Sequence, residues 1–265
     1  MKKIILLIVL FSLVSLSDSM ATYNVSCRSV IFSDSTKVRR LYGKQVSERV
    51  TPASTTKVMT ALLVLKNLPL NSYVRVSPRA TYVQPSKINV KPYEEYKVQD
   101  LLYALLLNSA NDASVVLAEA VAGSEEKFVN MMNNTARQLG ARNTRFANSH
   151  GLPSKKRQYT TAYDMYLIFR EALKHDFFRN AIKHKYKTIA SRDGRTVYLK
   201  NHNKILFKGW KKYIYGKTGY TRQARSCFVG TLQKGKSTLI IAVFGCQNRW
   251  DDIKHVVSNF GGVSL

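Results

Sequence analysis

Apolar and polar positions along the chain change their period twice. Residues 29–33 and 37–42 alternate around a polar turn at Asp34-Ser35-Thr36, which predicts two strands. The middle of the chain has helical periods. Helices are predicted over 58–65, 98–107, 113–121, 124–139 and 161–173. Strand patterns return at 196–199, 213–217, 226–231 and 237–244, and a final helix begins near Asp251. Strands, then helices, then strands indicate an α+β domain with an inserted helical lobe and a cleft between the two parts.

Two stretches refine this outline. Residues 58–65 are apolar on nearly every face, which is typical of a helix buried on all sides. Residues 66–98 contain four prolines, at positions 69, 78, 85 and 92, and therefore predict no long element.

The N-terminus predicts export. A short basic start, Met1-Lys2-Lys3, precedes an apolar run over 4–16, and Ser19-Met20-Ala21 offers small residues for cleavage. We expect a signal peptide over 1–21 and one domain over 22–265. The run is short for a membrane span, and no later stretch approaches spanning length, so no transmembrane domain is expected in the mature chain.

The net charge of +26, in a chain of 265 residues, is the second unusual property. Such a cation is attracted to polyanions, and export favours anionic membrane lipids or cell-wall polymers as partners. No recognition helix or aromatic RNA-binding signature accompanies the charge, so no specific nucleic-acid partner is expected. The alternative, that the charge serves solubility alone, stays open at this point.

The cysteines and histidines predict neither metal nor cofactor. Cys27, Cys227 and Cys246 suggest an exported protein that does not depend on disulfides. A hairpin turn at Lys234-Gly235 would place Cys227 opposite a residue near Val243, so no disulfide is expected within the hairpin. The five histidines lack metal-ligand spacing.

Two S-x-x-K strings compete as sites of nucleophilic chemistry. Ser124 follows a glycine and precedes two acids, which is typical of a helix N-cap with a lysine, Lys127, that points to water. Ser54 instead runs into the buried helix, where Lys57 lies one turn away. Burial lowers the pKa of a lysine and can make it a base for a serine hydroxyl, so Ser54 and Lys57 are the candidate pair.

Two further strings belong with this pair. Ser109-Ala110-Asn111 is predicted in a loop between two helices, where polar side chains can face a cleft. Lys217-Thr218-Gly219 is predicted on a strand edge, where an extended peptide can pair with the backbone. Gly219 would permit close backbone approach.

These strings in their contexts resemble the low-molecular-mass penicillin-binding proteins, and more closely the D-alanyl-D-alanine carboxypeptidases of serine peptidase family S11. The resemblance is carried by residues 50–60, 101–113, 146–152 and 216–221, and it extends over about 28–262. It implies a β-lactamase/transpeptidase-like fold, in which helices flank an antiparallel sheet. The C-terminal β domain and membrane-binding helix of many relatives are expected to be absent.

The resemblance also implies roles. Ser54 would attack the carbonyl between two D-alanines, Lys57 would accept its proton, and Ser109 would relay a proton to the leaving amine. Asn111 would hold the substrate backbone. The backbone N–H groups of Ser54 and Tyr220 would receive the oxyanion.

Substrate binding is implied at the strand edge. Lys217 and Thr218 would face the terminal carboxylate, with Gly219 beside them and Arg249 as a third partner. Pro85-Ser86 and Arg225 depart from the family pattern, which often has Gly-Ser and glycine there. These departures could change substrate preference or β-lactam rates.

The expected function is removal of the terminal D-alanine from peptidoglycan pentapeptide stems, with β-lactams as covalent inhibitors, in the periplasm or extracytoplasmic envelope. Alternatives are DD-endopeptidase action on cross-links, or non-catalytic binding of cell-wall polyanions. A class A β-lactamase would need a deacylating glutamate, and residues 150–170 contain none.

Overall fold

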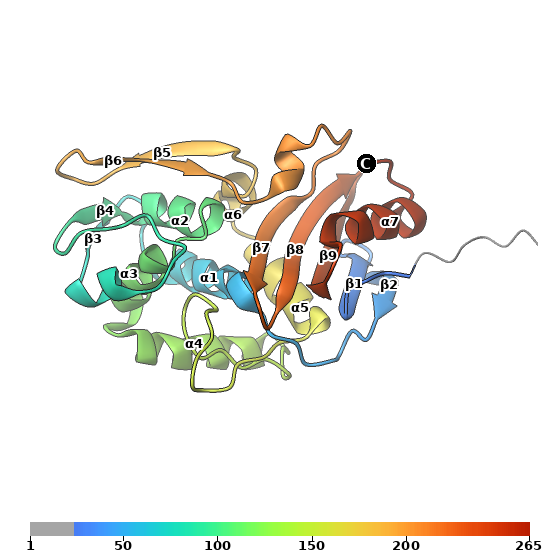
Figure 1. The fold of residues 1–265 in the computed structure, drawn as a ribbon, viewed down its shortest axis with the longest axis horizontal. Coiled ribbons are helices and arrows are strands. Elements are labelled where there is room, and N and C mark those ends of the chain that lie inside the picture. Colours follow the sequence, from blue (N-terminus) through green and yellow to red (C-terminus); the bar gives the residue numbers. More distant parts are fainter. Residues whose placement is uncertain (1–23) are drawn as a thin grey trace, which may run out of the picture.

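The computed structural model describes residues 24–265, so the predicted signal peptide lies outside the described residues and stays a prediction. Its largest sheet is antiparallel and has the strand order β2-β1-β9-β8-β7 (Figure 1). The strands are β1 (Ser29–Asp34), β2 (Arg39–Lys44), β7 (Tyr215–Thr221), β8 (Arg225–Lys234) and β9 (Ser237–Cys246). The first two and the last three strands of the described residues thus share one sheet, as the strand patterns toward the two ends predict.

Two apolar layers cover this sheet. Alternate side chains of β1 and β9 point to opposite faces, so Ile31 and Ala242 join the core on one side while Phe32 and Val243 join the core on the other. Helix α5 (Ala162–Ala172) packs on the first face and α7 (Arg249–Gly261) on the second. Because both faces are covered, all six residues of β1 are buried.

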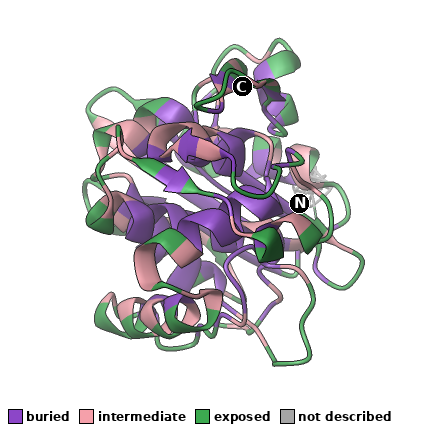
Figure 2. Cartoon of the chain, turned by 90° about the vertical axis from the view of Figure 1, so that its left-hand side faces the viewer, coloured by how far each residue is buried: buried purple, intermediate pink, exposed green. Residues whose placement is uncertain are grey.

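The helical lobe fills the middle of the chain. Helix α1 (Lys57–Asn67) is buried over its first eight residues and packs against α2, α3 and α5. The other helices of this lobe are α2 (Val98–Leu107), α3 (Asn111–Ala122), α4 (Glu125–Gln138) and α6 (Asp176–Ala181). Figure 2 shows the buried residues gathered in the interior and the exposed ones along the rim. No helix in the described part of the chain is long and apolar enough to cross a bilayer.

Two small sheets complete the lobe. Strands β3 (Tyr73–Arg75) and β4 (Glu95–Lys97) form one, and β5 (Tyr186–Ala190) and β6 (Thr196–Lys200) form the other. Strands β3, β4 and β5 and helix α6 were not predicted from the sequence. Strands of three residues carry almost no periodic signal, and β3 and β4 become strands only by pairing with each other across 20 residues.

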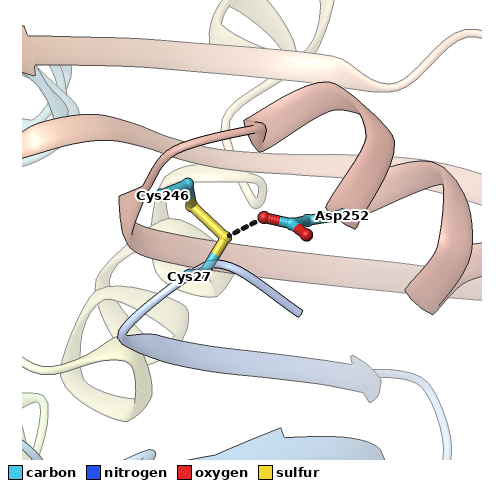
Figure 3. A group of neighbouring side chains, drawn as sticks. All are labelled: Cys27, Cys246 and Asp252. Atoms are coloured by element: carbon cyan, nitrogen blue, oxygen red, sulfur yellow. Dashed lines mark hydrogen bonds between the residues drawn. A yellow bond between two sulfur atoms is a disulfide. The ribbon is translucent and has the colours of Figure 1, made fainter. Parts of the chain in front are cut away.

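The disulfide prediction is wrong in part. Cys27 and Cys246 form a disulfide, whereas Cys227 is free and buried, so the prediction of no bond within the hairpin is confirmed (Figure 3). The partner of Cys246 comes from the neighbouring strand: β1 pairs with β9, and Arg28 N donates to Phe244 O, which brings Cys27 beside Cys246. Only the strand order reveals this pair.

Candidate functional site

A cleft of about 260 Å³ lies between the outer edge of the large sheet, at β7, and the helical lobe. Its lining comes from seven separate segments of the chain. The lining residues are Ser54, Pro85, Ser86, Ser109, Asn111, Leu152, His202, Thr218, Gly219, Tyr220 and Arg249. Seven of the nine predicted site residues are among them, and the other two, Lys57 and Lys217, are fully buried and bonded to residues of the lining. The predicted site residues are therefore brought together.

Ser54 lies in a short 3-10 helix, η1 (Ala53–Thr56), directly before α1. The expectation that Ser54 and Lys57 share one α-helix is therefore corrected, although the two remain neighbours. Lys57 Nζ lies 3.2 Å from Ser54 Oγ, and it donates to Asn111 Oδ1 at 2.7 Å and to the His150 backbone oxygen at 2.8 Å. Three partners from three segments thus fix the ammonium at the serine.

Lys57 sits where its charged form is disfavoured. The side chain is fully buried, and burial together with the positive charge of Lys217 holds the pKa of Lys57 well below its usual range. Its two other close acceptors are a neutral amide and a backbone carbonyl. A neutral amine at this position can accept a proton from the Ser54 hydroxyl.

Ser109 and Lys217 form a second pair on the opposite wall. Lys217 Nζ donates to Ser109 Oγ at 3.0 Å and to the Thr218 backbone oxygen at 3.0 Å. Burial, reinforced by the charge of Arg249, lowers the pKa of Lys217 to about 7. Ser109 has a φ of 59°, in the left-handed region that most residues avoid, and this turn places its hydroxyl between α2 and α3.

Asn111 was predicted in the loop but is the first residue of α3. Its side chain is almost fully buried, accepts from Lys57 and donates through Nδ2 to Gln84 O at 2.8 Å. Its backbone N–H donates to Ser86 O at 2.7 Å. Pro85-Ser86, the departure from the family pattern, therefore forms part of the cleft rim and is tied to it through Asn111.

Strand β7 is the last strand of the sheet, so one of its edges is open to an incoming chain. Gly219 lies on this edge so close to the serine that a methyl group added there would be 3.1 Å from Ser54 N. The neighbouring Tyr220 is exposed, with 64% of its surface accessible. Arg225, the other position expected to depart from the family pattern, adopts a φ of 57° just after the turn.

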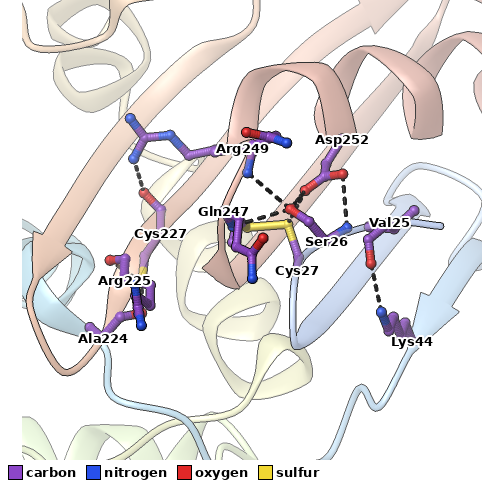
Figure 4. Close-up of a disulfide and its surroundings, with 12 residues drawn as sticks. Val25, Ser26, Cys27, Lys44, Ala224, Arg225, Cys227, Gln247, Arg249 and Asp252 are labelled. Atoms are coloured by element: carbon purple, nitrogen blue, oxygen red, sulfur yellow. Dashed lines mark hydrogen bonds between the residues drawn. A yellow bond between two sulfur atoms is a disulfide. The ribbon is translucent and has the colours of Figure 1, made fainter. Parts of the chain in front are cut away.

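Arg249 reaches the cleft from the first turn of α7 (Figure 4). Its Nη1 donates to Cys227 O at 2.7 Å and to Gly219 O at 3.3 Å. Burial lowers the pKa of Arg249 to about 10, and its Nε has no hydrogen-bond partner among residues 24–265. A buried guanidinium with a free donor at a cleft is suited to bind an anion.

The N-terminal segment braces the helix that carries Arg249. Asp252 accepts hydrogen bonds from the backbone and hydroxyl of Ser26, and Ser26 Oγ in turn accepts from Gln247 N and Asn248 N (Figure 4). The disulfide of Cys27 joins the same place, and Asp252 Oδ2 lies 3.1 Å from Cys27 Sγ. The position of Arg249 therefore depends on residues more than 200 positions earlier.

The competing string behaves as the sequence predicts. Ser124 is the N-cap of α4, with its hydroxyl accepting from Lys127 N at 3.3 Å, and Lys127 is exposed. No residue of this string lines the cleft.

Three residues of the site had no predicted role: His202, His150 and Leu152. His202 lines the cleft because its backbone N–H donates to Leu107 O, a contact between distant segments that leaves no local signal in the sequence. His150 supplies the carbonyl that holds Lys57, while burial lowers the pKa of its ring to about 3 and keeps the ring neutral. The segment around His150 carried part of the family resemblance without an assigned role.

In the described part of the chain, one group has three candidate metal-ligand atoms within 4.8 Å of one another: Cys27, Cys246 and Asp252. Its two sulfur atoms are joined in the disulfide. This group lies beside α7 and does not line the cleft.

Comparison with known proteins agrees with this geometry. The family model described as D-alanyl-D-alanine carboxypeptidase, peptidase S11, matches residues 16–248. The chain belongs to this family. It is 36% identical over 214 residues to the D-alanyl-D-alanine carboxypeptidase DacF of Bacillus subtilis, which covers 77% of the chain and 54% of DacF. It is 33% identical over 235 residues to DacC of Escherichia coli, which covers 84% of the chain and 58% of DacC. The chain thus spans little more than half the length of these relatives.

Solved structures show the same fold. The D-alanyl-D-alanine carboxypeptidase of Mycobacterium tuberculosis H37Rv superposes with a TM-score of 0.84 at 31% identity, over 93% of this chain and 94% of that one. The Streptomyces K15 DD-transpeptidase superposes with a TM-score of 0.82 at 27% identity, over 91% and 99%. The predicted α+β, transpeptidase-like fold is confirmed.

Proposed function

We propose that this chain is a serine-type D-Ala-D-Ala carboxypeptidase that removes the terminal D-alanine from peptidoglycan pentapeptide stems. The observation that carries the proposal is the Ser54–Lys57 pair, in which a fully buried lysine of lowered pKa lies 3.2 Å from a hydroxyl that lines a cleft. The curated relatives named as D-alanyl-D-alanine carboxypeptidases support the substrate class.

In the first step Ser54 Oγ attacks the carbonyl carbon of the penultimate D-alanine as its proton passes to Lys57 Nζ. The negative charge on the carbonyl oxygen is stabilised by the backbone N–H groups of Ser54 and Tyr220. The bond to the terminal D-alanine then breaks, and the proton that Lys57 took from Ser54 passes through Ser109 to the leaving amine, which returns Lys57 to its neutral form. This leaves an acyl-enzyme on Ser54.

Two groups hold the substrate in this scheme. Asn111 binds its backbone, and Lys217, Thr218 and Arg249 bind the terminal carboxylate. Arg249 lines the cleft, and the buried Lys217 bonds to Ser109, which also lines it, so both supply positive charge at this end of the cleft. An extended stem peptide pairs along the open edge at Gly219.

Water then hydrolyses the acyl-enzyme, with Lys57 as the base that activates it. β-Lactams, as mimics of the dipeptide, acylate the same serine. Among the described residues no aspartate or glutamate lines the cleft, so we expect the β-lactam adduct to be long-lived.

The test is release of D-alanine from a muropeptide pentapeptide. We expect wild type and Ser124→Ala to release it equally and Ser54→Ala to release none. Intact mass after exposure to benzylpenicillin should show one adduct on wild type and on Ser124→Ala, and none on Ser54→Ala. Full D-alanine release by Ser54→Ala would contradict the assignment of Ser54 as the nucleophile, and no release by wild type would favour the non-catalytic alternative.

A second candidate is transfer of the acyl group to an amine, which the similarity to a DD-transpeptidase favours. Adding an amine acceptor such as glycylglycine separates the two activities: a carboxypeptidase forms the tetrapeptide, whereas a transpeptidase forms the amide with the acceptor. A cross-linked dimer as substrate tests the endopeptidase alternative in the same way.

We also propose that the protein works outside the cytoplasm, in the periplasm or at the envelope, and contacts anionic lipid or wall polymer. The net charge of +26, the Cys27–Cys246 disulfide and the cell-wall relatives support this. Trypsin added to intact cells or spheroplasts, with the disulfide measured by thiol labelling, tests the location.

A further inference from the structure

The β5–β6 hairpin has one face that is largely exposed. It lies along one side of the molecule, above α2, as Figure 1 shows. Its inner face is apolar, with Ile189 and Leu199 buried in the core. Because side chains alternate in a strand, Tyr186 and Tyr198 both point to the opposite, outer face.

Three aromatic rings cluster on this outer face. Tyr186 stacks on Tyr198 with ring centroids 5.5 Å apart. Phe207, from the 3-10 helix η3 (Lys204–Phe207), has its ring centroid 5.5 Å from that of Tyr186. Their exposed fractions are 44%, 65% and 38%. Large rings that remain this exposed while packed together form a continuous apolar patch, which marks an interaction surface.

Lysines surround the patch. Lys185 and Lys200 place their ammonium groups 6.0 and 5.5 Å from the centre of the Phe207 ring. Further exposed lysines of the same segment are Lys183, Lys204, Lys208, Lys211 and Lys212. None of these seven has a carboxylate of the described residues within 4.0 Å. The positive charge here is therefore not neutralised by the protein.

The positive surface continues into a cavity of about 740 Å³. Lys185 lies 5.3 Å from the centre of the Tyr213 ring, and Tyr213 lines the cavity together with Lys183, Lys211 and Lys212. The wall also includes apolar groups, among them Leu173. Cationic and apolar groups thus alternate over one connected surface.

We propose that this face, defined as Lys185, Tyr186, Tyr198, Lys200 and Phe207, docks the protein on an anionic lipid bilayer. Aromatic rings are favoured at the boundary between headgroups and acyl chains, and lysines beside them are attracted to anionic headgroups. A soluble polyanion would use the lysines but has no need of three exposed rings, so the combination favours a membrane. The inference extends the anionic contact proposed above to a defined surface, and it does not depend on the enzymatic activity.

Docking here would also orient the cleft. Asn201 follows the hairpin directly, and His202 comes next. The backbone N–H of His202 donates to Leu107 O, and His202 lines the cleft. The hairpin and the cleft rim are therefore one connected stretch of chain. A bilayer bound to the hairpin would hold the cleft at a fixed height above the lipid.

The experiment is sedimentation of the full chain with vesicles of phosphatidylcholine alone or mixed equally with phosphatidylglycerol. The measured quantity is the gain in binding that phosphatidylglycerol produces, so any contribution of residues 1–23 is common to all variants. We expect Lys185→Gln/Lys200→Gln to reduce this gain by roughly thirtyfold, since each lysine near an anionic surface contributes on the order of fivefold. The charge-matched control, Lys155→Gln/Arg157→Gln on an exposed loop elsewhere, should change it little.

A second variant separates lipid from polymer. Tyr186→Ser/Tyr198→Ser/Phe207→Ser keeps every charge, and we expect it to lose the binding that survives at raised salt. The fluorescence of Trp210, three residues after Phe207 in the chain, should be quenched by brominated phosphatidylglycerol in a Trp250→Phe background, and less so in the aromatic variant. Equal losses in the lysine pair and its control, or an aromatic variant that binds like wild type, would overturn the proposal. D-alanine release from a soluble pentapeptide, with thermal melting, shows that each variant is folded and reports on the enzyme separately.

Discussion

The two S-x-x-K strings of this chain have the same spacing and opposite environments. Lys57 is fully buried with its pKa held well below the usual range, whereas Lys127 is exposed beside an N-cap serine. Ser54 lines a cleft and Ser124 bonds to its own helix. The spacing brings a lysine near a serine in both cases. Burial and a neighbouring cleft decide which pair can perform acyl transfer.

Replacing each lysine tests this difference with the largest expected effect. Lys57→Met removes the base and should slow D-alanine release and acylation by benzylpenicillin by roughly a thousandfold. Lys127→Met should leave both rates unchanged. Stopped-flow acylation and D-alanine release measure them, and comparable losses in the two variants would remove the distinction between the strings.

Glycine substitutions test how tightly the backbone is packed around Ser54, compared with the backbone around Ser124. A methyl group on Gly151 would lie 1.9 Å from Ala53 O, and φ there is +87°, so Gly151→Ala should destabilise the fold by about 3 kcal/mol and displace Ser54. Gly123, just before Ser124, has φ of +75° and open space around it, so Gly123→Ala should cost about 1 kcal/mol. Urea denaturation measures the free energy of unfolding of both variants. Equal losses of stability would show that the backbone near Ser54 can move to accommodate the added methyl group.

The pH dependence tests the buried lysines of the cleft. The pKa of Lys217 is about 7 in the folded chain, so kcat/KM for pentapeptide should fall above that pH, by roughly tenfold per unit, as the charge that binds the carboxylate is lost. In the unfolded chain the pKa returns to 10.5, so the unfolded state binds more protons between about 7 and 10.5. Folding stability should therefore rise with pH over the range in which activity falls.

Bound substrate sharpens this experiment. The carboxylate of the substrate favours the charged form of Lys217. The fall in kcat should therefore begin at a higher pH than the fall in kcat/KM. Lys127→Met should leave the profile unchanged. A kcat/KM that stays constant from pH 7 to 10 would exclude Lys217 as the titrating group.

The smallest effect belongs to the second string. Ser124 accepts a hydrogen bond from Lys127 N at the start of α4, and Ser124→Ala should lower stability by about 1 kcal/mol. D-alanine release should not change. Thermal unfolding and the release assay measure the two outcomes, and any loss of activity at unchanged stability would give Ser124 a role in the chemistry.

Local patterns predicted what depends on local sequence. The buried α1, the N-cap at Ser124 and the hairpin around Gly235 followed from periodicity, capping and turn residues. The convergence of the three strings followed from family resemblance, because no periodicity places Lys217 beside Ser109. The Ser54 turn differs from prediction because η1 is set by tertiary contacts, including the approach of Gly151 to Ala53.

What could not be predicted depends on long-range pairing. The Cys27–Cys246 disulfide requires that β1 lies beside β9, which the sequence does not reveal. His202 enters the cleft through one backbone bond to Leu107. Apolar and polar residues alternate too little in β5 to predict a strand. The strand forms because β6 pairs with it over five residues.

The brace on α7 has a consequence for the order in which the molecule matures. Ser26 and Cys27 hold the helix start that presents Arg249, so the first and last parts of the described chain must meet before the carboxylate-binding wall exists. The central strand of the sheet, β9, and Arg249 are also among the last residues to be made, so the cleft cannot be completed until nearly the whole chain is available. The Cys27–Cys246 disulfide then links the two ends of the described chain beside the helix that carries Arg249.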